Sequence, residues 1–117
     1  MKGKEPEKAR LLHILEAIKE IGKYLDAAGS EDDFYRNSAL KFATVKQLEI
    51  IGEAAGKLSA DTRKLAGNME WHAIISMRNR MVHDYEQIDF TIVYQVAKDE
   101  LQELKETVEE MLKHFND

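Results

Sequence analysis

Apolar residues in the first half of the chain recur at steps of three and four, the spacing of one helix face. They predict a helix over about residues 7–27, with the apolar positions Leu11, Ile14, Leu15, Ile18, Ile21 and Leu25. Gly29 can adopt the left-handed conformation that ends a helix, and Ser30 with Asp33 resembles a capping box. A second helix is predicted over about residues 31–58, and its apolar residues on several faces indicate a central position.

Small residues form a patch near the end of this second helix: Gly52, Ala54, Ala55 and Gly56. Two glycines inside a helix cost about 1 to 2 kcal/mol relative to alanine. A close helix crossing would compensate for this cost, so we expect another backbone to approach the patch.

The second half predicts a short capped helix or turn over residues 59–67 and two further main helices. The third main helix should begin near Met69, and its heptad positions place Arg78 within an otherwise apolar stripe. Asp89 is a suitable N-cap for the last helix. Regular three- and four-residue steps predict one long, straight helix there, with the apolar positions Val93, Ala97, Leu101, Leu104, Val108, Met111 and Phe115.

Short connections between these helices predict an all-α fold, an up-down four-helix bundle with an additional short helix. The 117 residues suit a single domain, 1–117, in which about residues 1–6 form a flexible N-terminus. The chain has no cysteine, which fits a reducing compartment, and it has no run of 18 apolar residues. We therefore expect a cytoplasmic protein without a signal peptide or membrane span.

The net charge of −5 argues against broad electrostatic attraction to nucleic acid. Residues 59–85 contain four Lys and Arg against three Asp and Glu, a balance of +1 that leaves −6 for the rest. A polyanion would have to be bound locally, in this region.

The segment from Arg78 to Tyr85 holds the residues most suited to chemistry. Arg78 and His83 are five residues apart, about 140° around a regular helix, so they would point in different directions. Either the helix ends or distorts near Val82, or a second subunit completes the site. Arg78 and Tyr85 would share a face.

These side chains suit phosphodiester cleavage in RNA, where the 2′-hydroxyl is an internal nucleophile and neither a metal nor a cofactor is needed. A guanidinium binds phosphate with paired hydrogen bonds, and a histidine can transfer protons near neutral pH. The hypothesis makes His83 the general acid or base and Arg78 the group that stabilises the transition state. Asn79 would support Arg78, and Arg80 could contact substrate.

Structural roles are the alternative for the same residues. Arg78 could be a buried ion-pair member, with Glu53 as its partner, and His83 could be a structural histidine. Tyr85 could be an ordinary bundle aromatic, and Trp71 a core residue. The histidines lack the close spacing of metal ligands, so we expect no metal site.

The residues Arg78, His83 and Tyr85 match the R-x4-H-x-Y pattern of the HEPN superfamily (higher eukaryotes and prokaryotes nucleotide-binding), and the chain resembles its HepT-like toxin branch. Three further stretches are similar to that branch, at residues 11–18, 48–54 and 71–79, so the resemblance covers roughly residues 8–113. One departure is the stretch 67–70, where the branch often has a proline-rich approach to the tryptophan.

The resemblance implies a metal-independent endoribonuclease toxin whose homodimer brings two motifs to one cleft. Arg78 and His83 would be the catalytic pair, with Asn79 as the accompanying polar residue. It also implies a cognate minimal nucleotidyltransferase antitoxin, which could silence the toxin by transferring AMP onto Tyr85. The alternative function is a non-catalytic helical module that binds a nucleotidyltransferase.

Overall fold

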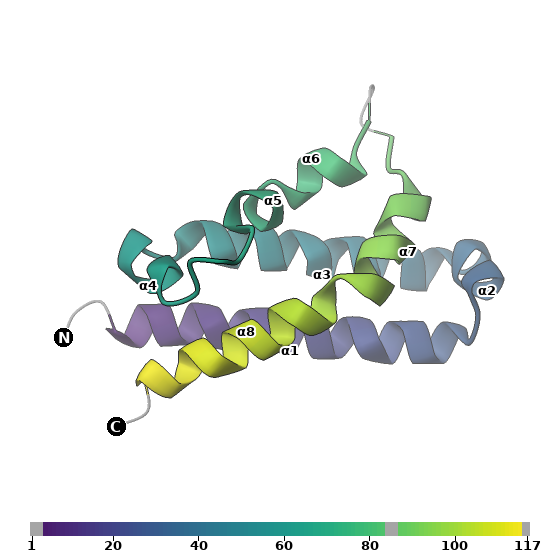
Figure 1. The fold of residues 1–117 in the computed structure, drawn as a ribbon. Helices are drawn as coiled ribbons and strands as arrows, with labels where there is room; N and C mark the ends of the chain where they lie inside the picture. The colour runs from purple at the N-terminus through teal and green to yellow at the C-terminus, as the bar shows by residue number, and fades with distance from the viewer. Residues whose placement is uncertain (1–3, 84–86, 116–117) are drawn as a thin grey trace.

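The computed structural model describes residues 4–83 and 87–115. Over these residues the regular secondary structure consists of helices, joined by turns and short loops, and one isolated β-bridge. Two long antiparallel helices, α1 (Lys4–Ala28) and α3 (Ser38–Lys57), pack along each other. The chain then rises through α5 (Trp71–Ile75) and α6 (Met77–Met81) and returns through α7 (Phe90–Asp99) and α8 (Leu101–Leu112), which ends beside α1 (Figure 1). The predicted all-α bundle is confirmed.

The connection from α1 to α3 contains the short helix α2 (Glu31–Arg36). Gly29 has the predicted positive φ, 86°, and the Ser30 hydroxyl accepts a hydrogen bond from the Asp33 amide at 3.1 Å. The prediction of one helix over 31–58 is wrong, because Asn37 is extended and its side chain caps α3 by accepting from the Leu40 amide at 3.0 Å. Residues 4–6, expected to be flexible, belong to α1.

The third main helix is also divided. Ser76 ends α5, and its hydroxyl donates to the His72 carbonyl at 2.6 Å, a bond that competes with regular helix geometry. After this break Met77 takes the buried position, while the Arg78 side chain is 57% exposed. The predicted interruption of the buried stripe by Arg78 is therefore wrong. The short capped helix α4 (Ala60–Lys64) is confirmed, with Ser59 as its N-cap.

The last two helices, α7 and α8, replace the single straight helix that the pattern predicted. They meet at Glu100 at an angle visible in Figure 1, since α7 packs on α3 and α6 whereas α8 packs on α1. The apolar pattern itself was right, and six of its seven positions are buried: Val93, Ala97, Leu101, Leu104, Val108 and Met111. A 3-10 turn, η2 (Lys113–Phe115), follows α8.

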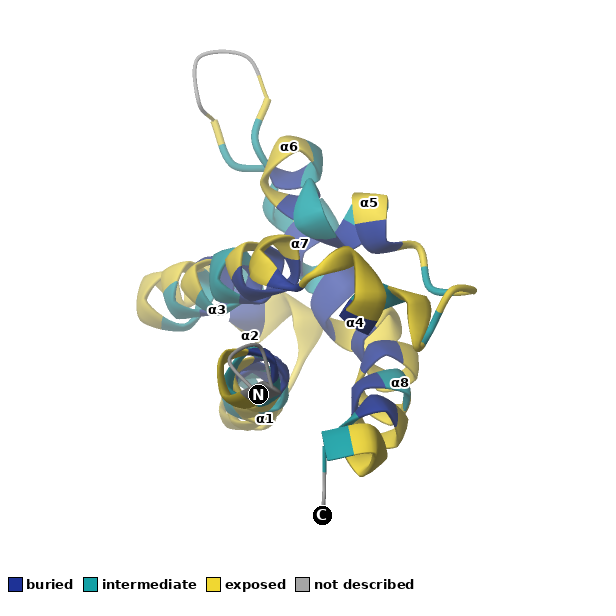
Figure 2. Ribbon diagram, turned by 90° about the vertical axis from the view of Figure 1, so that its left-hand side faces the viewer, coloured by how far each residue is buried: buried dark blue, intermediate teal, exposed yellow. Residues whose placement is uncertain are grey.

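The core lies where the inward faces of these helices meet, as the buried positions in Figure 2 show. Trp71 is a core residue, as expected, 8% exposed and with Nε1 donating to the carbonyls of Arg63 and Ala66 at 3.1 and 3.0 Å. The largest fully buried side chains are Phe34, Leu11, Ile14, Ile21, Leu48, Ile51, Met81, Met111, Val93, Val96, Val108 and Thr44. None of the helices described in the structure is long and apolar enough to cross a membrane.

A buried carboxylate, Glu7, ties the start of α1 to the far end of α3. It accepts hydrogen bonds from the Ser59 amide at 2.7 Å and from Arg10 at 2.8 Å, and Arg10 also donates to the Lys57 carbonyl at 2.7 Å. Burial alone would raise the pKa of Glu7, but hydrogen bonds from Thr62, Ser59 and Arg10 outweigh it and hold the pKa below its usual value.

The predicted close crossing at the small-residue patch is confirmed at Gly52. A Cβ there would lie 3.2 Å from the Ile74 carbonyl oxygen and 3.4 Å from that of Ile75, so α3 and α5 approach through their backbones. A Cβ at Gly56 would make only an ordinary 3.6 Å contact with the Ile75 side chain.

This difference predicts different stabilities for two alanine substitutions. Gly56→Ala should stabilise the fold by up to about 1 kcal/mol, because alanine favours a helix interior. Gly52→Ala has the same intrinsic gain but must push α5 away, so it should be the less stable variant by about 1 kcal/mol or more. Urea unfolding of both measures the difference, and equal gains would contradict a close crossing at Gly52.

Candidate active site

The helix α6 ends between the two residues expected to be catalytic. Val82 is extended (φ −110°, ψ 124°) and forms the isolated antiparallel bridge with Ile88. The His83 amide donates to the Gln87 carbonyl at 2.7 Å, and the Asp89 amide donates to the Met81 carbonyl at 2.7 Å. Of the two explanations for the 140° separation, the end of the helix near Val82 is therefore confirmed.

These backbone hydrogen bonds pair residues 81–83 with residues 87–89 as in a β-hairpin, and they fix the backbone of His83. The segment between the paired residues contains Tyr85, which lies outside the described residues together with its two neighbours. The His83 side chain is 58% exposed, so a substrate can reach its ring.

Asp89 holds the His83 ring from the start of α7. One carboxylate oxygen, Oδ1, accepts from the amides of Thr91 and Ile92 at 3.0 and 3.2 Å, which confirms the predicted N-cap. The other oxygen, Oδ2, lies 2.9 Å from His83 Nε2. The hydrogen bond from His83 lowers the pKa of Asp89, and the amides of Ile92 and Thr91 lower it further.

This geometry selects the histidine tautomer. An ionised carboxylate can only accept hydrogen bonds, so Nε2 must carry the hydrogen. In the neutral ring Nδ1 then keeps its lone pair and can accept a proton. The contact therefore leaves Nδ1 as the ring atom that is available to a bound molecule.

Arg78 lies in the first turn of α6 and reaches back to α3. Its Nε is 3.5 Å from Glu49 Oε2, so the structure supplies Glu49 as its ion-pair partner instead of the predicted Glu53, and the pair lies at the surface rather than buried. Because the ion pair engages Nε, the two terminal nitrogens of the guanidinium can donate to a phosphate.

Arg78 also borders a groove of about 360 Å³ between α3 and α5. Glu53, one helical turn from Glu49, lines the same groove, and so does Gly52, whose missing side chain allows α5 to approach. The close helix crossing therefore sets the position from which Arg78 extends. The full lining is Leu48, Glu49, Gly52, Glu53, Gly56, Ile75 and Arg78.

The other two predicted residues of α6 have different surroundings. Asn79 is exposed beside Arg78. Arg80 makes a two-pronged ion pair with Glu100, both distances being 2.9 Å, which ties α6 to the junction of α7 and α8. Its hydrogen bonds lower the pKa of Glu100. Arg80 therefore has a structural contact, and its expected contact with substrate stays a prediction.

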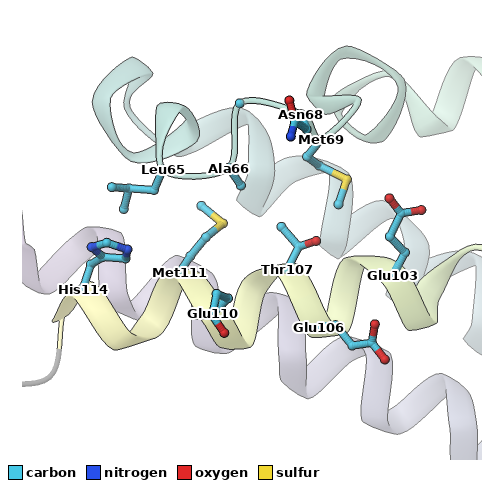
Figure 3. Close-up of a pocket in the computed structure, with 11 residues that line it drawn as sticks. Leu65, Ala66, Asn68, Met69, Glu103, Glu106, Thr107, Glu110, Met111 and His114 are labelled. Atoms are coloured by element: carbon cyan, nitrogen blue, oxygen red, sulfur yellow. The ribbon is translucent and has the colours of Figure 1, made fainter.

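A second hollow, of about 440 Å³, lies between residues 65–69 and α8 (Figure 3). Three glutamates of α8 line it, Glu103, Glu106 and Glu110, with His114 at its end. Carboxylates repel a polyanion, so this hollow is poorly suited to RNA. Over the described residues, no group of three potential metal ligands is close enough to hold an ion.

Sequence reasoning missed the partners of both central residues. Asp89 was expected only as a helix cap, and Glu49 was not singled out at all. The signal for Asp89 was its place six residues after His83. That spacing becomes informative only once the hairpin-like pairing of Val82 with Ile88 is known.

Comparison of the sequence with known proteins identifies the family to which the chain belongs. The family model described as Ribonuclease HepT-like matches residues 14–111, most of the chain and the whole of the site. The chain belongs to the HepT-like ribonuclease family.

Two relatives show how far the similarity extends. A protein of Methanocaldococcus jannaschii named "Putative RNase MJ1216" is 34% identical over 91% of this chain and 87% of its own length. A protein of Thermococcus cleftensis named "Probable ribonuclease HepT" is 30% identical over 94% of this chain and 99% of its own. No solved structure matches the chain.

For this HepT-like chain, the two roles of Asp89 can be separated by substitution. Asp89→Asn keeps an oxygen that can cap α7 but loses the charge that faces His83, whereas Asp89→Ala loses both. At pH 7 the melting temperature should therefore fall in the order wild type, Asp89→Asn, Asp89→Ala.

The pH dependence follows from the lowered pKa of Asp89. A depressed folded-state pKa adds stability above the unfolded value, and this is lost as the pH falls through the folded value. The gap between wild type and Asp89→Asn in circular dichroism melts should therefore close below about pH 4, near the unperturbed aspartate pKa. Asp99→Asn, at an exposed position, is the control. A gap that persists in acid would contradict the charged contact.

Proposed function

We propose that this chain is a metal-independent endoribonuclease that cleaves RNA through attack of the 2′-hydroxyl on the adjacent phosphate. The observation that supports it most strongly is the placement of His83, exposed and held through Nε2 by Asp89 at 2.9 Å. A histidine fixed in this way presents a proton acceptor to bound substrate. Membership of the HepT-like ribonuclease family supports the same chemistry.

The proposed reaction is an internal transesterification, in which one bond to phosphorus forms and another breaks. His83 Nδ1 removes the proton of the 2′-hydroxyl, the 2′-oxygen forms a bond to phosphorus, and the bond from phosphorus to the 5′-oxygen breaks. A general acid returns a proton to the leaving oxygen, which gives a 2′,3′-cyclic phosphate and a 5′-hydroxyl. Arg78 stabilises the charge on the phosphate oxygens, and Asn79 supports it as a hydrogen-bond donor.

The proposal extends to assembly. Two chains would form a homodimer in which the two motifs face one cleft, so that a second His83 can serve as the general acid. The exposure of both Arg78 and His83 supports this arrangement, because each remains accessible from outside its own chain.

The proposal also extends to regulation as a toxin. A cognate minimal nucleotidyltransferase would act as antitoxin by transferring AMP onto Tyr85, which is two residues from His83. The phosphate of the added AMP would compete with the substrate phosphate for Arg78. Mass spectrometry of wild type and Tyr85→Phe, each produced with such a partner, tests this part, since an unmodified Tyr85 would remove it.

Cleavage itself can be tested with purified protein, labelled RNA and EDTA at low ionic strength, where salt screens the attraction between phosphate and the local cations least. Wild type should cleave, and Arg78→Ala and His83→Ala should each lower the rate by about 100-fold or more, in the range of a lost general base or charge-stabilising donor. Arg80→Ala, on the same helix, tests the predicted substrate contact of that residue, because a purely structural Arg80 would leave the rate of the folded variant unchanged.

Circular dichroism must show that all variants remain folded. Equal cleavage by wild type and the Arg78 and His83 variants would refute the proposal. Light scattering of the same preparations gives the particle mass, and a species of one 13.5 kDa chain would remove the homodimer from the proposal.

A further inference from the structure

Phe42 is an exposed aromatic residue beside the candidate active site. Three large apolar side chains are notably exposed among the described residues, and Phe42, at 53%, exceeds Leu12 at 46% and Leu65 at 41%. Its ring makes a T-shaped contact with the ring of Phe90, with centroids 5.3 Å apart and planes at 86°. Phe42 is therefore held in place by an aromatic neighbour while much of its surface faces solvent.

Neighbouring residues link this ring to the candidate active site on two sides, toward His83 and toward Arg78. Phe90, which holds Phe42, directly follows Asp89, whose carboxylate holds the histidine. On the other side, Phe42 lies seven residues before Glu49 on α3, which places the two on one face about 10 Å apart. Glu49 in turn contacts Arg78. Phe42 is thus linked to His83 through Phe90 and Asp89 on one side, and to Arg78 through Glu49 on the other.

The charges around Phe42 suit a nucleic-acid strand. Lys41 places its Nζ 4.4 Å from the Phe90 ring centroid, and Lys46 is exposed one helical turn after Phe42. The chain as a whole has a net charge of −5 and repels phosphate. The two lysines beside the exposed ring supply local positive charge that can attract it. Aromatic rings flanked by cations bind single-stranded nucleic acid by stacking its bases.

We propose that Phe42 is the base-stacking platform of a subsite for single-stranded RNA, with Lys41 and Lys46 contacting the flanking phosphates. The inference rests on the proposed ribonuclease function. It adds a site that binds a nucleotide of the substrate other than the two joined by the cleaved bond. Phe42 and Glu49, the ion-pair partner of Arg78, lie about 10 Å apart along α3, so the stacked base would lie away from the phosphate bound at Arg78.

Binding can be measured without cleavage in a His83→Ala background, using the fluorescence anisotropy of a short, labelled oligoadenylate RNA. Phe42→Ala should raise Kd roughly 5- to 150-fold, which is the stacking of about 1–3 kcal/mol per base converted at 1.4 kcal/mol per tenfold. Phe42→Leu should lose nearly as much, because leucine is apolar but has no ring. Phe42→Trp should retain the affinity, and Leu65→Ala, the matched exposed control, should leave Kd unchanged.

Light scattering of the same variants separates RNA binding from subunit contact. Unchanged Kd in Phe42→Ala and Phe42→Leu would overturn the inference, as would a parent that binds no RNA. A lower particle mass in Phe42→Ala, with RNA affinity kept in Phe42→Leu, would also overturn it and assign the ring to an interface with a second copy.

The two proposals fail separately. If the chain with intact His83 does not cleave RNA while Phe42 still controls binding, the proposed function fails and the subsite stands. If RNA is cleaved and Phe42→Ala binds normally, only the subsite fails.

Discussion

The Asp89 carboxylate connects the structure of the bundle to the chemistry of its surface. Through Oδ1 it caps α7, and through Oδ2 it holds the His83 ring at 2.9 Å. Because one side chain makes both contacts, the direction of α7 and the orientation of the histidine depend on each other. The lowered pKa of Asp89 keeps it ionised, so it acts only as an acceptor and fixes the hydrogen of His83 on Nε2.

Arg78 depends on a different constraint, the close approach of α5 to α3 at Gly52. The crossing brings the start of α6 beside the middle of α3, where Glu49 meets the Arg78 Nε at 3.5 Å. The two central residues are thus held from opposite sides, by α3 and by α7. A rigid scaffold on either side of a short, exposed segment is a common way to position catalytic groups.

The parts of this architecture that follow from periodicity could be predicted from the sequence. The spacing of Leu11 to Leu25 and of Val93 to Met111 identified buried faces, and Gly52 identified the crossing. The breaks at Asn37, Ser76 and Glu100 were missed, because apolar spacing continues across them. Polar side chains and the different packing partners of the two helices on either side determine those breaks. The periodicity of apolar residues contains no information about either.

The site followed the same division. The pattern from Arg78 to Tyr85 predicted where the site lies, and that stays a prediction. The geometry of a regular helix called for either a break between Arg78 and His83 or a second subunit, and the structure has the break at Val82. Their partners, Glu49 and Asp89, lie on other helices, so only the tertiary structure could identify them. The predicted Glu53 is one turn from Glu49, an error of the size expected when helix register is inferred without contacts.

The most direct test of the account is the chemistry of the cleaved bond. An RNA that the protein cleaves would be compared with the same RNA carrying a single 2′-deoxynucleotide on the 5′ side of that bond. The account predicts that the substituted bond is not cleaved and that the normal product ends in a 2′,3′-cyclic phosphate. Cleavage of the deoxy-substituted bond at an undiminished rate, or a product with a 5′-phosphate, would contradict it.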